Sequence, residues 1–385
     1  MAEPNAGTDA EQQWLLDQGV EAWNRWRHEN PEVRPRLAGI DLNEQDLQMA
    51  QLQGADLTGA SLFDADLSKA NLDGASLRGA HLFEADLRQA RLVDADLHGA
   101  NLGNAYLCEA DLRRARLDDA YLDGARLAGA NLQGASLREA YLGTADLSHA
   151  DLSGADLTAA QLPRAHLQGA VLVATNLEGA NLSGARVFGI ATWGARLERA
   201  TQRDLVITPK DEPTITIDDL GLAQMLCALL GNEQAGMTMG ALVADVALIL
   251  GRFKGGRKVA LEAIRAALRA HGYVPGLLEL DQPSNRDLTG TVRLLAQMAR
   301  FMLVDTSEPR YIPEEFQTVV PGLSVPVQPL VLQRRAELSM LQGLVKYACV
   351  LPPYAYKDLA DLLEHVEDRV IAPAVAKAKD LRAAQ

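Results

Sequence analysis

Residues 55–79 read ADLTG ASLFD ADLSK ANLDG ASLRG, which are five units of five residues with one shared pattern. Leucine recurs at every fifth position from Leu37 to Leu182, alanine stands two positions before it over most of this span, and the phase continues to Leu197. A period of five would spread the leucines around a helix, and an odd period breaks the two-sided alternation of a strand. A chain that turns a corner every five residues fits the pattern, with leucine and alanine inside and Gly, Asp, Asn and Ser at the turns.

The repeated unit resembles the pentapeptide-repeat family, whose motif A(D/N)LXX is matched almost throughout residues 37–200. The resemblance implies a right-handed quadrilateral β-helix, which is a solenoid with four units per coil. The repeat comprises about 33 units, so we expect about eight coils. At roughly 4.8 Å per stacked strand, the solenoid would form a rod about 40 Å long.

The ends of a solenoid expose unpaired backbone groups, so they need caps. Residues 1–36 are predicted to form an N-terminal helical cap, because apolar side chains recur near helical spacing between Glu11 and Asn30. We expect these apolar side chains to pack on the first coil; they are Trp14, Leu15, Val20, Trp23 and Trp26.

The surface charge of the rod bears on one known role of such solenoids. The residue before each leucine points outward, and residues 20 positions apart stack on one face. One face begins with Asp46, Asp66 and Asp86 but continues with mixed charge, and another, which begins at Asp41, is nearly neutral. Some pentapeptide-repeat proteins mimic DNA and protect type II topoisomerases, a role that needs negative charge sustained along a face. A DNA-mimicking, topoisomerase-protecting protein is therefore only the second alternative for this chain.

Two aromatic residues mark a further feature of the rod surface. Phe63 and Phe83 occupy equivalent positions in successive coils, so we expect their rings to stack. Two interpretations of this pair stay open. Either the rings form an exposed docking spot for a partner protein, or they form a ladder that stabilises neighbouring coils.

The repeat is lost after residue 200. Residues 201–243 are predicted as a linker followed by a helix, and residues 244–385 as a flavodoxin-like α/β domain with a parallel five-stranded sheet. The expected strands are Val246–Leu250, Tyr273–Leu280, Arg300–Val304, Val325–Leu332 and Ala348–Leu351. The expected helices are Ile217–Asn232, Arg257–Ala270, Leu288–Ala299, Pro313–Val319, Glu337–Lys346 and Tyr356–Lys379. Ligands of such sheets bind off the carboxyl ends of the strands.

The order of elements over about residues 244–380 resembles the Toll/interleukin-1 receptor (TIR)-like group, which is related in shape to nucleoside 2-deoxyribosyltransferases. The resemblance rests on three places. These are Gly251-Arg252-Phe253 after the first strand, the polar loop 282–287 after the second, and Asp305-Thr306-Ser307 followed by Pro313-Glu314-Glu315-Phe316.

The TIR-like resemblance implies a catalytic glutamate and a nucleotide site. In the enzymatic members, a glutamate at the start of the helix after the third strand attacks or stabilises the anomeric carbon as an N-glycosidic bond breaks. That position falls on Glu315, with Glu314 as the near alternative. The implied ligand is NAD or another nucleotide, and the residues expected around it are Gly251, Arg252, Phe253, Arg286, Asp305 and Ser307.

Other features of the same segment keep its catalysis an open question. The Trp-Cys pair that precedes the glutamate in many TIR domains is absent. Neither a GxGxxG motif nor a Walker motif follows the first strand. Glu314 and Glu315 also suit a helix N-terminus through the helix dipole alone.

Composition narrows the classes of function. The chain has 385 residues and a formal net charge of −14, which argues against direct binding to nucleic acid. No stretch has the length and apolar character of a membrane span, and no secretory signal is evident. The three cysteines have no ligand-like spacing, so we expect no metal site and a cytoplasmic location.

The leading hypothesis is therefore an intracellular interaction or signalling scaffold. The rigid rod would bind a protein partner, and the TIR-like domain would self-associate as a homo-oligomer, dock or bind a nucleotide. The first alternative is a nucleotide N-glycosidic bond hydrolase, similar to an NADase, in the C-terminal domain.

Overall fold

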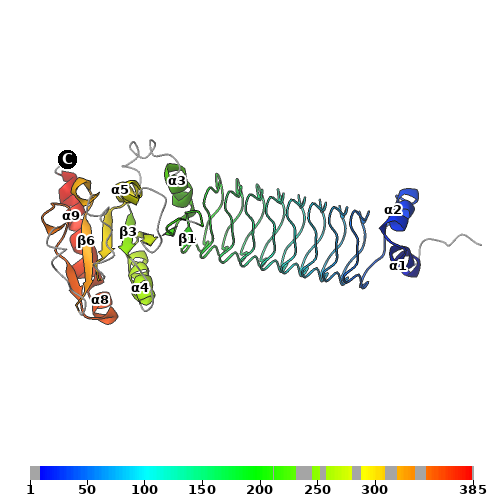
Figure 1. Ribbon diagram of the computed structural model, residues 1–385, viewed down its shortest axis with the longest axis horizontal. Coiled ribbons are helices and arrows are strands. Elements are labelled where there is room, and N and C mark those ends of the chain that lie inside the picture. The colour runs from blue at the N-terminus through cyan, green and yellow to red at the C-terminus, as the bar shows by residue number, and fades with distance from the viewer. Residues whose placement is uncertain are drawn as a thin grey trace, which may run out of the picture. The chain divides into compact units, whose positions relative to one another are not determined.

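The computed structural model describes residues 9–210, 212–230, 245–251, 257–279, 288–307, 319–333 and 344–383. By its internal contacts, the chain divides into two compact units, Met1–Leu205 and Val206–Gln385. The first unit contains the repeat, and the second contains a sheet with helices around it (Figure 1).

The first unit is a stack of parallel coils, each with four faces. Residues 20 positions apart form parallel bridges, and these bridges run from Arg36 to Thr201. In one of them the Leu57 N–H donates to the Ser76 carbonyl over 2.7 Å, and the Ser76 N–H donates to the Ala55 carbonyl over 2.8 Å. Backbone groups of each coil are thus satisfied by the coils on either side. The predicted β-helical solenoid is confirmed.

The five-residue period has a physical cause at the turns. The residue two positions after each leucine has a positive φ, from Gly39 at 67° to Arg199 at 60°. Glycine adopts this left-handed conformation without strain, and Asn and Asp adopt it more readily than other residues do. Between the turns, the leucine and the alanine two positions before it point inward; Leu117 and Ala115, for example, are fully buried.

Two helices, α1 (Asp9–Asp17) and α2 (Val20–Glu29), precede the first coil. Trp23 of α2 is completely buried. Trp14 of α1 is 59 % exposed, so the expectation that it packs on the first coil is wrong. The reason is its place on α1, since the buried Leu16 lies on the opposite side of this short helix.

Polar atoms of α2 replace the coil that is missing before the first one. Trp23 Nε1 and Arg27 Nε both donate to the Gln51 carbonyl, over 2.9 and 3.2 Å. Asn24 Oδ1 accepts the Gln51 N–H over 2.8 Å, and Arg27 Nη2 donates to the Gln53 carbonyl over 3.2 Å. These bonds satisfy ladder groups that would otherwise be exposed at the open end of the solenoid.

The described residues of the second unit, together with Leu205 at its boundary, form a mixed sheet of seven strands in the order β1-β2-β4-β3-β5-β6-β7. The strands from β3 to β7 pair in parallel, whereas β2 runs antiparallel to β4. The strands are β1 (Leu205–Val206), β2 (Ile215–Ile217), β3 (Val246–Gly251), β4 (Val274–Glu279), β5 (Phe301–Asp305), β6 (Val327–Leu332) and β7 (Tyr354–Tyr356).

The mixed sheet corrects the prediction of five parallel strands. Strands β1 and β2 lie in or beside the segment 201–216, for which the sequence predicts a linker. β2 has only three residues and follows Pro213, so locally it looks like a loop. Its residues are buried because they pair with β4, where Ile217 lies opposite Gly276. These partners are far apart in the sequence, so no local pattern reveals the pairing.

The last strand also lies later in the chain than predicted. The pairing segment is Tyr354–Tyr356, whereas the predicted strand 348–351 contributes only an isolated bridge between Val327 and Val350. The run 348–351 is apolar because it is buried in the core, with Leu351 only 8 % exposed. The wrong assignment is therefore explained by a buried apolar run that forms only one bridge.

Helices cover both faces of the sheet. Ala247 and Ile249 of β3 pack in a buried cluster with residues of α4, α8 and α9. Leu248, between them, lines a small apolar cavity with residues of α3 and α5. The helices are α3 (Leu220–Leu230), α4 (Arg257–Ala270), α5 (Leu288–Met298), the 3-10 helix η3 (Val320–Gly322), α8 (Leu359–Glu364), the π-helix η5 (Val366–Ile371) and α9 (Ala372–Ala383).

The closing helix predicted for 356–379 is divided into α8, η5 and α9. Asp358 caps α8, since its side chain accepts the Asp361 N–H. Pro373, which has no N–H to donate, lies two residues after the end of the π-helical segment. The predicted helices Pro313–Val319 and Glu337–Lys346 lie mostly outside the described residues.

Candidate functional site

One face of the rod carries exposed aromatic side chains in two stacked pairs. The Phe63 and Phe83 rings lie 6.2 Å apart with an interplanar angle of 4°, which confirms the expected stacking. The Tyr121 and Tyr141 rings lie 5.0 Å apart, also at 4°. We call this surface the aromatic face. Its outward positions are those of Asp41, Ser61, His81, Asn101, Tyr121, Tyr141, Gln161 and Asn181, with the turn residues Asn43, Phe63, Phe83, Gly103, Asp123, Gly143, Pro163 and Ser183 beside them.

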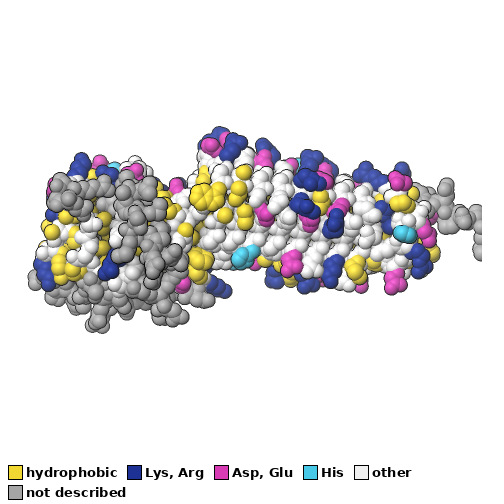
Figure 2. Space-filling model, turned by 90° about the horizontal axis from the view of Figure 1, so that it is seen from above, with side chains coloured by type: hydrophobic (Ala, Val, Ile, Leu, Met, Phe, Trp, Pro, Cys, Tyr) yellow, Lys and Arg dark blue, Asp and Glu magenta, His cyan; other side chains and the backbone are white. Residues whose placement is uncertain are grey.

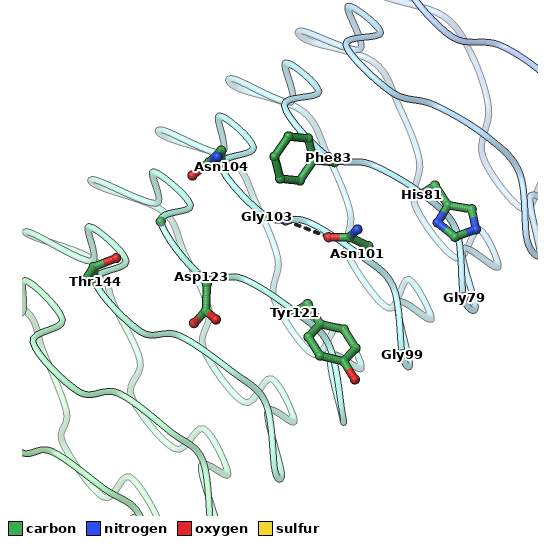
Figure 3. A pocket seen from close by; sticks show the side chains of 11 residues that line it. Gly79, His81, Phe83, Gly99, Asn101, Gly103, Asn104, Tyr121, Asp123 and Thr144 are labelled. Atoms are coloured by element: carbon green, nitrogen blue, oxygen red, sulfur yellow. Dashed lines mark hydrogen bonds between the residues drawn. The ribbon is translucent and has the colours of Figure 1, made fainter.

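A shallow, open depression of about 660 Å³ lies between the two aromatic pairs (Figure 3). Phe83 and Tyr121 stand at its two ends, and Gly103 and Asn101 form the coil between them. Gly103 leaves room for the Phe83 ring, because a Cβ at Gly103 would lie only 3.0 Å from Phe83 Cδ2. Asn101 Oδ1 accepts the Gly103 N–H over 3.1 Å and so fixes the turn at this point.

Polar side chains line one edge of the depression, at the turns of the coils that form it. Asp123 is exposed, and its Oδ1 atom accepts the Gly143 N–H over 2.6 Å. Asn104 and Thr144, both exposed, line the same edge. In the part of the chain that the structure describes, no ion pair includes Asp123. The depression thus combines two aromatic rings with a carboxylate that has no cationic neighbour bound to it.

The other three faces carry several ion pairs. Arg91 lies 2.5 Å from Asp73, and Arg114 lies 2.5 Å from Asp94. The hydrogen bond from Arg114 lowers the pKa of Asp94. Figure 2 shows basic and acidic side chains next to one another along the rod. Further pairs of this kind are Arg78–Asp96, Arg88–Asp86, Arg113–Asp111, Arg138–Asp156 and Arg196–Glu178.

The outward and turn positions of the aromatic face, from Asp41 to Ser183, hold no lysine or arginine. The sequence reveals the Tyr121–Tyr141 pair and its place on the Phe63–Phe83 surface through the same 20-residue spacing. Of the two pairs, only the Phe63–Phe83 stack is predicted from the sequence. The depression itself depends on the small residue Gly103, whose effect appears only when neighbouring coils are placed side by side.

The predicted ligand residues of the second unit lie partly within the described chain. Gly251 ends β3 and Asp305 ends β5, and these parallel strands are neighbours, so both residues lie at one edge of the sheet. Ser307 follows at the same edge. The other predicted residues lie outside the described residues; they are Arg252, Phe253, Arg286, Glu314 and Glu315.

Asp305 and Ser307 take part in the internal structure of this edge. Ser307 Oγ donates to Asp305 Oδ1 over 2.7 Å and accepts the Leu332 N–H over 2.9 Å. Ser307 is almost completely buried. The two side chains therefore link the end of β5 to the end of β6, whatever further role they have.

The described residues contain neither a metal-binding group nor a membrane-spanning helix. Among the described residues, no group of three or more His, Cys, Asp and Glu side chains is arranged to hold a metal ion. No helix in the described part of the chain is long and apolar enough to cross a membrane.

Comparison with known proteins identifies the first unit. A family model described as pentapeptide repeats matches in eight copies across residues 35–187. The solved structure of HetL, a pentapeptide-repeat protein involved in heterocyst differentiation regulation in the cyanobacterium Nostoc, is 33 % identical over 48 % of this chain and 95 % of HetL, with a TM-score of 0.29. The chain therefore belongs to the pentapeptide-repeat family, with the repeat in its first unit.

More distant solved structures also match the repeat. QnrB1, a plasmid-mediated fluoroquinolone resistance protein, is 18 % identical over 42 % of this chain and 91 % of QnrB1, with a TM-score of 0.21. A pentapeptide-repeat protein of the Arabidopsis thaliana thylakoid lumen is 26 % identical over 34 % of this chain and 70 % of that protein, with a TM-score of 0.18. No curated protein matches the chain.

Proposed function

We propose that this chain is a protein-interaction scaffold and that a partner protein docks on the aromatic face of its rod. The main observation behind this proposal is the stacked aromatic side chains on this face. In the tyrosine pair, Tyr121 is 51 % and Tyr141 is 41 % exposed. Large aromatic side chains are enriched among the residues that dominate binding energy at protein interfaces. A rigid solenoid presents such a surface preformed, so little entropy is lost when a partner binds.

Site-specific photo-crosslinking tests this proposal. A benzoylphenylalanine at Gln161 reports on the aromatic face, and one at Asn131 reports on the opposite face at the equivalent position of the repeat. We expect a defined adduct in cells from position 161 only, and we expect Tyr121→Ser to remove it. Equal labelling from both positions, or an adduct that persists in the Tyr121→Ser variant, would contradict the proposal.

A second candidate function, a nucleotide site in the second unit, is favoured by the strand order. The five parallel strands run β4-β3-β5-β6-β7, which is the order of doubly wound flavodoxin-like sheets. Such sheets bind ligands beyond the carboxyl ends of the first and third parallel strands, where Gly251 and Asp305 lie. We propose on this basis that the unit is TIR-like and binds NAD or a related nucleotide, with Glu315 as the candidate catalytic residue.

The nucleotide proposal is tested by NAD turnover with the full chain. We expect Glu315→Gln to abolish cleavage of the N-glycosidic bond, and Glu314→Gln tests the near alternative position in the same assay. If wild type and Glu315→Gln release nicotinamide at the same rate, Glu315 is not catalytic. If NAD also fails to raise the melting temperature of the chain, the nucleotide proposal is wrong as a whole.

A further inference from the structure

Carboxylates lie along both edges of the aromatic face. Glu44, Asp64 and Glu84 are exposed on three successive coils along one edge of this face. Asp119 and Glu139 are exposed along the other edge, and Asp119 lies 3.8 Å from His98. No lysine or arginine stands at the outward or turn positions of the aromatic face. The carboxylates along both of its edges therefore create a negative field over the depression.

Two arginines near the depression are bound to carboxylates of the neighbouring face. Arg78 binds Asp96 over 3.1 Å, and Arg138 binds Asp156 over 2.9 Å. Arg164 is exposed on the same corner as Asn104 and Thr144, one coil beyond Thr144, and no ion pair among the described residues joins it to Asp123. In the described part of the chain, Asp123 thus has no cation bound to it.

The two rings stand at different positions of the repeat. Phe83 and Tyr121 belong to coils that are separated by one intervening coil, so they are about 10 Å apart along the rod. Phe83 is at the turn position, and its ring lies over the space that a side chain at Gly103 would fill. Tyr121 is at the outward position, in line with Asn101 of the intervening coil. Both rings line the depression, so a planar group in the depression has an aromatic surface on two sides.

We propose that the depression binds an arginine side chain of a basic segment in the partner protein. The guanidinium lies in the depression against Tyr121 and pairs with Asp123 of the same coil, which takes part in no ion pair among the described residues. Guanidinium is planar and weakly hydrated, so it stacks on aromatic faces and binds a carboxylate at the same time. A lysine ammonium offers the charge but not the stacking plane. This inference rests on the proposed docking function of the aromatic face.

The test uses the full chain and a fluorescein-labelled octapeptide of alternating arginine and glycine, with the lysine-glycine octapeptide as its counterpart. Fluorescence anisotropy at low salt gives the two dissociation constants. We expect the arginine peptide to bind more tightly, and Asp123→Asn and Tyr121→Leu each to weaken it by about threefold or more.

Asp73→Asn is the matched control. Asp73 occupies the same position of its repeat unit on the opposite corner of the coil, and its Oδ1 atom likewise accepts a backbone N–H, that of Val93, over 3.0 Å. Both variants remove one negative charge, and both keep an oxygen that can accept the backbone N–H. We expect Asp73→Asn to leave the binding of the arginine peptide unchanged. The tryptophan-monitored melting temperature verifies that each variant is folded.

Three outcomes would overturn the arginine proposal and leave the docking function to its own crosslinking test. The first is equal affinity for the arginine and lysine peptides, and the second is equal weakening by Asp123→Asn and Asp73→Asn; both indicate unspecific charge attraction. The third is binding of neither peptide. If in that case the chain self-associates and Tyr121→Leu prevents it, a second copy is the occupant of the aromatic face.

Discussion

The two units of this chain are held together by different kinds of contact. In the rod, each backbone partner lies about one coil away in the sequence, and the same five-residue unit specifies every turn and every buried position. In the sheet unit, β2 pairs with β4 and β3 lies between β4 and β5, so its contacts join segments of unrelated sequence. The stability of the rod is therefore a sum of similar local terms, whereas the stability of the sheet unit depends on a few specific long-range contacts.

The stabilities of the two units can be measured separately because the tryptophans lie in only one of them. The four tryptophans lie at positions 14, 23, 26 and 193, all within the first unit. Tryptophan fluorescence therefore follows the unfolding of the rod, and circular dichroism follows both units. A substitution that acts on one unit should shift only the corresponding transition.

The largest effect is expected for a buried ion pair in the sheet unit. Asp218 accepts from Arg265 over 2.7 Å and from Arg269 over 2.5 Å, and these contacts tie the end of β2 to α4. The Arg265 side chain is only 2 % exposed. We predict that Asp218→Ala lowers the free energy of unfolding of the sheet unit by about 3–5 kcal/mol, because it leaves buried guanidinium groups without their main carboxylate.

Urea unfolding followed by circular dichroism measures this loss. Glu262→Ala is the control, since Glu262 lies 3.9 Å from the same arginine but its side chain is 56 % exposed. We expect the control to change the stability by less than about 1 kcal/mol. An equal loss in both variants would contradict the predicted weight of the Asp218 ion pair. A shift of the tryptophan transition would contradict the separate unfolding of the two units.

The second effect concerns the cap of the rod. Arg27 is buried and donates to the carbonyls of Val33, Gln51 and Gln53. Arg27→Met keeps much of the apolar stem but leaves these carbonyls without that donor, so we predict a loss of about 2 kcal/mol. Tryptophan fluorescence in urea measures it, and Arg25→Met, at an exposed position of α2, is the control. If both variants unfold at the same urea concentration as wild type, the cap does not stabilise the rod.

A smaller effect isolates the turn conformation of the repeat. Ala159 and Gly179 occupy the same turn position on successive coils, with φ values of 59° and 69°. Relief of the left-handed strain outweighs the greater freedom of glycine in the unfolded chain, so Ala159→Gly should stabilise the rod by about 0.5–1 kcal/mol. Gly179→Ala should destabilise it by a similar amount, because a Cβ there meets no atom closer than 4.0 Å and only the φ strain acts. Melting curves followed by tryptophan fluorescence test both signs.

The same contrast explains how much of the structure the sequence predicts. The repeat predicts the solenoid because each coil repeats the information of the one before it. Trp14 is the exception, since a nine-residue helix such as α1 has too few turns for the spacing of apolar residues to define its buried side.

In the sheet unit, the amphipathic helix Arg257–Ala270 is predicted with the bounds that the structure gives it. Strand β2 and the strand at Tyr354–Tyr356 are missed, because each has three residues and its burial depends on partners elsewhere in the chain. At the candidate site, the spacing of 20 predicts the Phe63–Phe83 stack. The depression next to it depends on Gly103, which in the sequence looks like any other glycine of the repeat.

The smallest predicted effect is a pH dependence confined to the sheet unit. His271 Nδ1 lies 2.7 Å from the Ala267 carbonyl, and Nε2 lies 3.3 Å from Glu367 Oε2. These two acceptors, the carbonyl more than the carboxylate, raise the pKa of His271 above its ordinary value of 6.5. The folded state therefore favours the protonated ring. The resulting stabilisation is fully present below pH 6.5 and is lost as the pH rises through the higher folded-state pKa.

Melting temperatures of wild type and His271→Gln between pH 5.5 and about 8.5 test this sign. We expect the advantage of wild type over the variant to be largest at the acidic end and to vanish at the alkaline end. Because the histidine is partly exposed, the shift should be small, within the range of surface ion pairs. Glu367→Gln should reduce the pH dependence without removing it, since the Ala267 carbonyl still accepts from the ring. An advantage that grows with pH would show that the neutral ring is the form that the fold prefers.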